Sequence, residues 1–292
     1  MQKFQLNILG ERINPGFKST RALFENEDFA GIQALAVKQV EAGAFALNVN
    51  AGTRALKDPH FMAEVIRAIQ AVVSVPLSFD FPNAEVQEVC LKTYDQEKAG
   101  GELPIINSIA ETRWDLVDLL KIRPFRVILM GTERLEDGVG IPNKTGEEIA
   151  TTAKRATRRL VREHGMRIGD VFVDISVSAL IADTTGLTRA TLDGIRLIGS
   201  DPELAGINIS GGLSNIGQQL PPKAADGSEL KGQLECAFLT VAVPAGMNTV
   251  LGTPWKEYRP LPEDNYVMST FRDFIELTGG KALRQVRRFY RS

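Results

Sequence analysis

The chain has 292 residues, of which 43% are hydrophobic and 24% are charged, values that are ordinary for a soluble globular protein. Its 34 Lys and Arg residues nearly balance its 36 Asp and Glu residues, so the charge gives no reason to expect a nucleic acid as partner. No apolar run is long enough to span a bilayer, and we expect no membrane partner. Two cysteines, Cys90 and Cys236, do not make a disulfide framework, and with only His60 and His164 beside them we expect no Cys/His zinc cluster. The sequence therefore predicts a reduced, cytoplasmic protein.

Short apolar runs alternate with longer amphipathic segments along the whole chain. The runs predict buried strands at 5–11, 45–50, 76–80, 104–108, 125–130, 170–175, 206–210 and 247–252. Helices are predicted at 28–41, 58–69, 84–94, 114–120, 145–163, 188–198, 234–243 and around 271–275. Such strict alternation favours a parallel (β/α)8 TIM barrel over a doubly wound open sheet. No linker rich in Pro, Gly or Ser divides the chain, so we expect a single domain over residues 1–292.

The least regular stretch is the polar segment 218–232, which follows the seventh predicted strand. In a barrel this connection lies on the face where active sites are found. The segment is either a tolerated surface insertion or a lid or docking loop, and the sequence leaves both interpretations open.

The catalytic groups of a TIM barrel collect where its strands end. The predicted strand ends carry many amides and few titratable groups; in chain order they are Glu11, Arg12, Asn14, Asn48, Asn50, Asp80, Asn83, Asn107, Ser108, Met130, Thr132, Asp174, Ser176, Asn208, Ser210, Asn215 and Asn248. The set contains no lysine or histidine, which disfavours a Schiff-base aldolase, a histidine base and a histidine metal site. The glycines of segment 210–215 permit a phosphate cradle, but a tight turn is the simpler interpretation.

Four of these residues, Asp80, Asn107, Asp174 and Asn215, suit one flat, polar heterocycle. A carboxylate accepts two hydrogen bonds side by side, which matches a ring N–H next to an exocyclic amino group, and amides can read the remaining edge. Each residue singly could instead cap a helix or form an Asx turn. Together they predict one pocket.

At these residues the sequence resembles a known family. The resemblance rests on GERIN at 10–14, LNVNAG at 47–52, SFDFPN at 78–83, INS with Glu111 close behind, VDI at 173–175 and GLSNIGQ at 212–218. In this order and spacing they are similar to the pterin-binding methyltransferases that pass a methyl group between tetrahydrofolate and a corrinoid protein. That group resembles dihydropteroate synthase and the folate module of cobalamin-dependent methionine synthase.

The resemblance implies roles for individual residues. Asp80, Asn107 and Asp174 match the positions that hold the pterin ring, and Asn215 matches the asparagine that reaches N5 and is the expected catalytic residue. The rest of the expected folate-binding set consists of Gln218, Glu11, Asn14 and Asn50.

The sequence also departs from the family pattern. Asn48 stands in strand two where an acid is usual, and the loop after Gln218 is long and lacks an expected arginine, with Lys223 as the nearest basic residue. The C-terminal basic and histidine motif of dihydropteroate synthase is absent. So is an Asp-x-His-x-x-Gly cobalamin motif, since no aspartate stands two residues before His164. The corrinoid is therefore expected on a separate protein.

The predicted activity is methyl transfer between a corrinoid protein and N5 of tetrahydrofolate, in the direction from methylcobamide to tetrahydrofolate that a demethylation pathway needs. The folate, as tetrahydrofolate or 5-methyltetrahydrofolate, is the substrate, and cobalamin is carried by the partner protein. We expect a homodimer and no metal bound by this chain. Three alternatives stay open: a dihydropteroate synthase-like pterin transferase, a barrel that binds a divalent metal through Glu11, Asp80 and Asp174, and a non-catalytic pterin-binding subunit.

Overall fold

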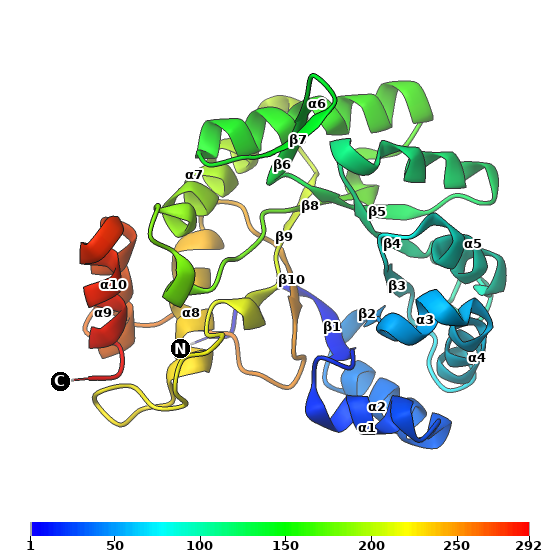
Figure 1. Cartoon of the computed structure of the whole chain (residues 1–292), viewed down its shortest axis with the longest axis horizontal. Helices are drawn as coiled ribbons and strands as arrows, with labels where there is room; N and C mark the ends of the chain where they lie inside the picture. The colour runs from blue at the N-terminus through cyan, green and yellow to red at the C-terminus, as the bar shows by residue number, and fades with distance from the viewer. Residues whose placement is uncertain (1, 292) are drawn as a thin grey trace.

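Eight parallel strands form the centre of the computed structural model, which describes residues 2–291 (Figure 1). The strands are β1 (Asn7–Ile13), β2 (Ala44–Val49), β3 (Leu77–Asp80), β4 (Ile105–Ile109), β5 (Arg126–Met130), β8 (Val171–Asp174), β9 (Asn208–Ser210) and β10 (Thr249–Gly252). Their order in the sheet, β10-β1-β2-β3-β4-β5-β8-β9, is that of a (β/α)8 barrel. The predicted TIM barrel and all eight predicted strands are therefore confirmed.

The barrel closes between β9 and β10, the two end strands of the sheet. At the starts of these strands the Asn248 amide N donates to Ile209 O (3.3 Å). At their ends the Leu251 amide N donates to Gly211 O (3.1 Å), and Gly212 pairs with Leu251 in an isolated bridge. This seam is joined at its two ends, whereas the other neighbouring strands form regular ladders, with register shifts in the β1–β2 and β4–β5 pairs.

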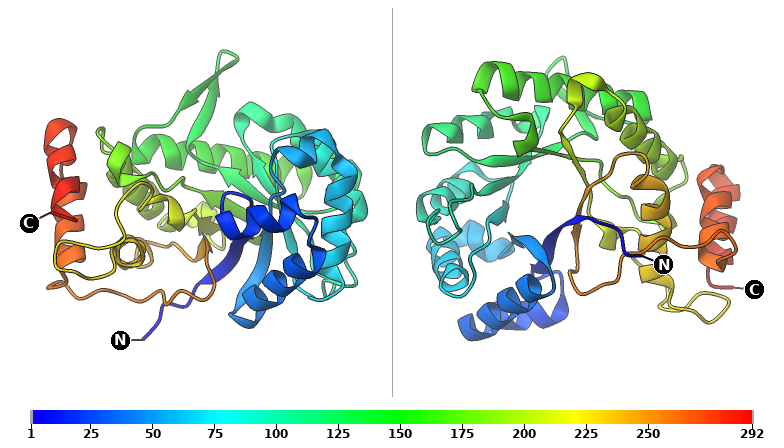
Figure 2. Two further views of the ribbon diagram at one scale, coloured as in Figure 1. Left: turned by 60° about the horizontal axis from the view of Figure 1, so that its bottom comes forward. Right: turned by 180° about the vertical axis from the view of Figure 1, so that it is seen from behind.

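Helices surround the barrel (Figures 1 and 2). The α-helices are α1 (Lys18–Glu25), α2 (Phe29–Glu41), α3 (Thr53–Lys57), α4 (Pro59–Gln70), α5 (Ala84–Thr93), α6 (Gly146–His164), α7 (Leu187–Gly199), α8 (Leu230–Ala242), α9 (Tyr266–Ile275) and α10 (Gly279–Arg288). The 3-10 helices are η1 (Glu111–Lys121), η2 (Ile168–Asp170), η3 (Leu180–Ala182), η4 (Pro202–Leu204) and η5 (Leu213–Asn215). Among residues 2–291, no helix is long and apolar enough to cross a membrane.

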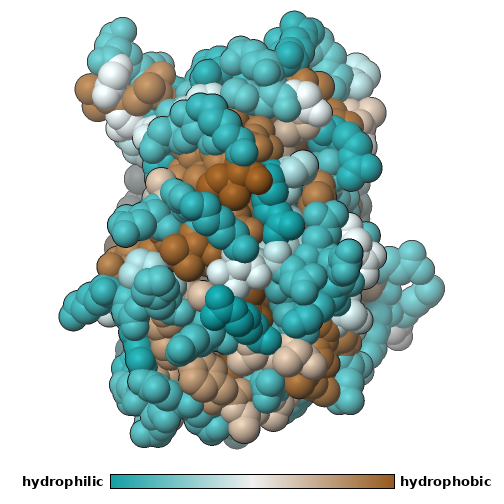
Figure 3. All heavy atoms as spheres, turned by 90° about the vertical axis from the view of Figure 1, so that its right-hand side faces the viewer, coloured by the Kyte–Doolittle hydropathy of each residue, from teal (hydrophilic) through white to brown (hydrophobic). Residues whose placement is uncertain are grey.

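The main hydrophobic core joins the strands to the inner faces of these helices. Large side chains such as Phe61, Phe79 and Phe271 are fully buried in it. On the outer face around α4 and α5, apolar side chains reach the surface between hydrophilic ones (Figure 3). Scattered apolar residues of this kind are ordinary on a globular surface.

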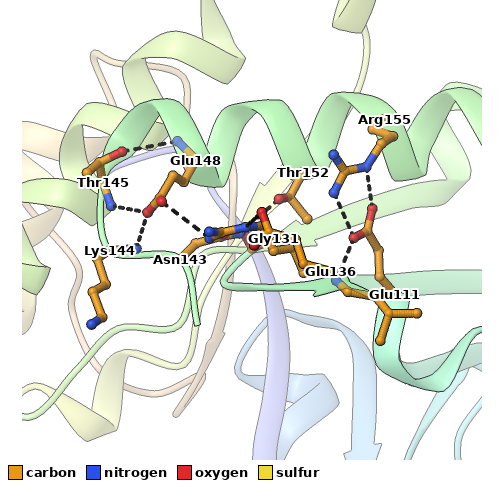
Figure 4. A network of polar contacts seen from close by, with 11 residues as sticks. Glu111, Gly131, Glu136, Asn143, Lys144, Thr145, Glu148, Thr152 and Arg155 are labelled. Atoms are coloured by element: carbon orange, nitrogen blue, oxygen red, sulfur yellow. Dashed lines mark hydrogen bonds and ion pairs between the residues drawn. The ribbon is translucent and has the colours of Figure 1, made fainter. Parts of the chain in front are cut away.

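A polar network attaches the long helix α6 to the barrel (Figure 4). The Asn143 side chain donates from Nδ2 to Gly131 O (2.8 Å) and to Thr152 Oγ1 (2.9 Å). Thr145 and Glu148 form a capping box at the first turn of α6. The network ties the residues just before α6 to the end of β5.

Glu111, which belongs to one of the family-like motifs, has a structural role. Its carboxylate accepts two hydrogen bonds from Arg155 of α6 (2.7 and 2.8 Å) and one from the Leu135 amide N (3.0 Å). These bonds, with the charge of Arg155, hold the pKa of Glu111 below its ordinary value although its partial burial acts to raise it. Glu111 therefore braces η1 against α6.

Several elements lie outside the sequence prediction. A hairpin of β6 (Glu133–Glu136) and β7 (Val139–Pro142) projects from the barrel (Figure 2, left), and α10 follows α9 beyond α8. The hairpin turn has positive φ at Asp137 and Gly138, the conformation that an Asp-Gly turn favours. That dipeptide was a readable signal. Helices α1 and α3 were also missed, and α8 begins four residues earlier than predicted.

Candidate functional site

Inward-pointing side chains fill the barrel in two layers. The lower layer is a separate hydrophobic cluster of Leu9, Ala46, Ile105, Ile128 and Phe172, each at most 5% exposed. Successive side chains of a strand alternate between its two faces, so residues two positions further on point to the same interior. These residues include Glu11, Asn48, Asn107 and Asp174. The barrel therefore carries a polar layer directly above an apolar floor.

Asn48 is the centre of the polar layer on β2, β3 and β4, and it is only 1% exposed. Its Nδ2 donates to Asp80 Oδ2 (3.1 Å), while its Oδ1 accepts from Asn107 Nδ2 (3.1 Å) and Ser78 Oγ (3.1 Å). An acid at this position would offer no donor to Asp80 and would repel it. The asparagine in place of the family's usual acid thus holds two predicted pterin residues together.

Asp80 uses one of its two oxygens for protein contacts. Oδ2 accepts from Asn48 and from Asn50 Nδ2 (3.2 Å), and within residues 2–291 no hydrogen bond reaches Oδ1. Burial raises the pKa of Asp80 above its ordinary value, and the two amide hydrogen bonds counteract this rise. Oδ1 is available to a ligand that carries an N–H group.

Asp174 lies near Asp80 at the end of β8. Its Oδ1 accepts from the Ser176 amide N (2.6 Å). Burial raises the pKa of Asp174 to about 6, against the hydrogen bonds from Ser176, and the charge of Asp80 adds to the rise. Burial disfavours the ionised form of both carboxyl groups. Hydrogen bonds from ligand N–H groups would stabilise that form.

Asn215 ends η5, the turn that follows β9. Its Oδ1 accepts from Gln218 Nε2 (2.6 Å), which leaves its Nδ2 without a hydrogen bond in the described part of the chain. The predicted pair is therefore in contact. Gln218 orients the Asn215 amide so that its N–H groups remain free to donate.

Glu11 lies at the mouth end of β1 and is 6% exposed. Its Oε1 accepts from Thr253 Oγ1 (2.8 Å) and its Oε2 from Ser214 Oγ (2.8 Å). Asn14 and Asn50 stabilise loops, because their Oδ1 atoms accept from the amide N of Gly16 (2.8 Å) and Gly52 (2.7 Å), respectively.

A cavity of about 610 Å³ joins these residues. It is lined by Glu11, Asn14, Gly16, Phe17, Asn48, Asp80, Gly212, Ser214, Asn215, Gly217, Gln218, Gln219, Lys231 and Leu251. Asn107 and Asp174 stand outside this lining and adjoin it through Asn48 and Asp80. The volume is in the range of small-molecule sites.

Two residues placed at strand ends by the sequence lie elsewhere. Asn208 begins β9 and Asn248 precedes β10, and Asn248 Nδ2 donates to Asn208 Oδ1 (3.3 Å) at the opposite end of the barrel. The prediction that they belong to the mouth is wrong, because strands of three and four residues leave little distance between start and end.

The lining also contains residues that sequence reasoning missed. Lys231, at the start of α8, faces the cavity, whereas the sequence pointed to Lys223, which is exposed. The intervening loop turns back on itself: the Leu230 amide N donates to Pro222 O (2.9 Å) and the Ala225 amide N to Phe289 O (2.9 Å). The middle of segment 218–232 is thus anchored to the C-terminal part of the chain.

The double glycine before Asn215 serves packing. A Cβ on Gly211 would lie 2.9 Å from the Ile175 side chain, and the Asn215 amide N donates to Gly212 O (3.4 Å). These contacts favour the tight turn over the phosphate cradle.

A parallel barrel with a cavity of carboxylates and amides at its strand ends defines an α/β barrel protein built to bind a polar small molecule. The chain belongs to the family of pterin binding enzymes, whose model matches residues 11–251. It is 26% identical over 260 residues to a methylcorrinoid:tetrahydrofolate methyltransferase of Eubacterium limosum, covering 85% of this chain and 84% of that protein.

Solved structures share the fold. Dihydropteroate synthase of Xanthomonas albilineans with 4-aminobenzoic acid superposes with a TM-score of 0.57 at 16% identity, over 86% of this chain and 88% of that one. Dihydropteroate synthase of Thermus thermophilus gives a TM-score of 0.56 at 18% identity, over 87% of this chain and 91% of the other.

Proposed function

We propose that this protein transfers a methyl group from a methylated corrinoid, carried by a separate protein, to N5 of tetrahydrofolate. The observation that carries the proposal is the placement of Asn215, with its Nδ2 free, on the same cavity as the Asp80 and Asn48 network. The similarity to the Eubacterium limosum methyltransferase supports both the corrinoid and the direction.

Recognition of the pterin ring would use the polar layer. Asp80 offers Oδ1, and the raised pKa values of Asp80 and Asp174 mean that both carboxylates gain from new hydrogen-bond donors. The pyrimidine edge of a pterin carries a ring N–H beside an exocyclic amino group, which is the donor pair that a carboxylate accepts. Asn107 Oδ1 and its remaining N–H would read the rest of that edge. Leaving one such group unpaired in the pocket would cost ~1–3 kcal/mol, which makes the site selective.

Asn215 would act at the reacting nitrogen. In this direction the electron pair of N5 forms the bond to the methyl carbon, the pair of the broken methyl–corrinoid bond stays with the corrinoid, and N5 loses its hydrogen as a proton. The Asn215 amide N–H would donate to the electron pair that the departing proton leaves on N5, which favours the neutral methylated product. Gln218 keeps the Asn215 carbonyl oxygen turned away by donating to it. An amide is neither a Brønsted acid nor a base near neutral pH, so the hydrogen on N5 leaves as a proton to solvent.

The partner's corrinoid supplies the methyl group in this direction of transfer. This chain would contribute alignment, because the cavity holds N5 at the open end of the barrel, where a second protein can approach. Glu11, Asn14 and Asn50 would shape the wall and loops around the folate.

The test mixes the protein with tetrahydrofolate and free methylcobalamin and follows the visible spectrum of the cobalt together with 5-methyltetrahydrofolate formation. We expect a spectral change that requires both the protein and tetrahydrofolate. An unchanged spectrum without folate binding would refute the proposal. Folate binding without transfer, even with corrinoid proteins, would indicate a non-catalytic pterin-binding subunit.

The same preparation separates the remaining alternatives. Condensation of a pterin pyrophosphate with p-aminobenzoate would indicate a dihydropteroate synthase-like transferase, and loss of activity with a chelator would indicate a metal bound through Glu11, Asp80 and Asp174. In the described residues, no group of three or more His, Cys, Asp or Glu side chains is arranged to hold a metal ion. The homodimer and the cytoplasmic location stay predictions, which light scattering and cell fractionation would test.

A further inference from the structure

Glu11 connects three elements that meet at the seam of the barrel. It lies on β1, and its carboxylate accepts from Thr253, directly after β10, and from Ser214, in the turn after β9. Ser214 immediately precedes Asn215. We call this arrangement of Glu11, Ser214 and Thr253 the Glu11 clamp.

The turn that carries Asn215 is held from within by short-range backbone bonds, from the Ile216 amide N to Leu213 O (3.1 Å) and from the Gln218 amide N to Asn215 O (3.0 Å). Its first residue has no side-chain cap, and the backbone bond from the Asn215 amide N to Gly212 O is long, at 3.4 Å. The bridge between Gly212 and Leu251 is isolated, because the ladder between β9 and β10 is not continuous. A hydrogen bond from Ser214 to a buried carboxylate is stronger than one between neutral groups, so the clamp adds a strong tie from the turn to β1 and to the end of β10.

We infer that Glu11 is a positioning residue for Asn215 and acts through Ser214, not as a ligand of the pterin ring. Each of its oxygens already accepts a hydrogen bond from a hydroxyl, with an O···O distance of 2.8 Å, and the side chain is almost fully buried. The inference rests on the proposed function, because it assigns Glu11 to the placement of the group that acts at N5. It predicts a loss of rate without a matching loss of folate affinity.

The first test is Glu11→Ala, assayed as methyl transfer from methylcobalamin to tetrahydrofolate. We expect kcat to fall by about tenfold to a hundredfold, because a small displacement of a catalytic group has effects of this order, while KM for tetrahydrofolate changes by less than about threefold. In an Asn215→Ala background, the same change should alter kcat by less than about threefold, because the group it positions is gone.

Two further variants keep the test informative if Glu11→Ala does not fold. Ser214→Ala cuts the clamp with a smaller change and should reproduce the loss in kcat. Glu11→Gln should stay within about threefold of the wild type, because its carbonyl accepts from one hydroxyl and its amide donates to the other. Glu97→Ala is the matched control, since this exposed glutamate precedes β4 at the opposite end of the barrel.

Three outcomes would overturn the inference, in addition to an unchanged Ser214→Ala variant. These are a raised KM with unchanged kcat, losses that multiply fully in the double variant, and a Glu11→Gln variant as slow as Glu11→Ala. Failure of the proposed function looks different, because the wild type itself would then transfer no methyl group. If the wild type is active and Asn215→Ala is slow while Ser214→Ala matches the wild type, only the role of Glu11 is refuted.

Discussion

The two walls of the cavity are built in different ways. On one wall, Asn48, Asp80 and Asn107 stand on strands with continuous pairing and are bonded to one another. On the other wall, Asn215 stands on a turn beyond a three-residue strand at the seam and is supported by side chains. The residues proposed to recognise the pterin are thus fixed by the sheet and by one another. The position of Asn215 depends on a few individual side-chain hydrogen bonds, each of which one substitution can remove.

The largest effect is expected on the seam wall. Asn215→Ala should lower the rate of methyl transfer by about 10²–10³-fold, which is typical for losing one donor that acts in the transition state. Folate affinity should change little, because the polar layer is intact. Rates and tetrahydrofolate binding are measured on the same preparation, and an equal loss in both would mean that Asn215 only binds.

A smaller effect, on affinity, is expected on the sheet wall. Asn48→Asp removes the N–H that donates to Asp80 and places a second carboxyl group beside it, so the hydrogen bond is replaced by repulsion. Tetrahydrofolate affinity, measured by calorimetry, should fall by about tenfold to a hundredfold, corresponding to about 1.4–2.8 kcal/mol. Asn208→Asp, in the amide pair at the opposite end of the barrel, serves as the control. If both variants lose affinity equally, the effect is one of folding.

The carboxylates should make folate binding depend on pH. Asp174 has a pKa of about 6, and the ionised form is the one that accepts two N–H donors. Affinity should therefore rise by about tenfold per pH unit below pH 6 and level off above it, with a proton released on binding. Asp174→Asn should bind folate more weakly at pH 7 and without this dependence. A wild-type affinity that stays constant between pH 5 and 7 would contradict the assignment.

The same raised pKa makes the stability of the unliganded protein change with pH in the opposite direction to its folate affinity. Because burial raises the pKa of Asp174 from 3.8 to about 6, the folded protein binds more protons than the unfolded chain between these values. The contribution to the free energy of unfolding is therefore present below about pH 4 and is lost as the pH rises through 6. Denaturant titrations of the wild type and Asp174→Asn should diverge across that window.

The smallest effect is expected at the rim. Lys231 lines the cavity, and a folate carries an anionic glutamate tail, so Lys231→Met should weaken binding by about threefold to tenfold, less at high salt. Lys223→Met is a matched control, because Lys223 is exposed on the loop that turns away. Equal losses in both variants would point to the net charge of the protein instead of a contact.

Much of the fold was predictable because buried parallel strands are short apolar runs bounded by turns, and eight of them recur here. Asp80, Asn107 and Asp174 were predictable for the same reason, since each ends such a run. The partners of Glu11 were not, because Ser214 and Thr253 lie 203 and 242 residues away along the chain. Lys231 was missed because only the folded loop decides which of two lysines reaches the cavity.

The apolar floor of the barrel has a kinetic consequence. The lower end of the barrel is filled by Leu9, Ala46, Ile105, Ile128 and Phe172, so the cavity opens only at the mouth. A partner protein bound over the mouth would trap a ligand in the cavity. If methyl transfer proceeds as proposed, folate must enter before the partner docks and leave after it departs. A methylated corrinoid protein should therefore slow the escape of labelled tetrahydrofolate in a chase experiment, while free methylcobalamin should do so far less.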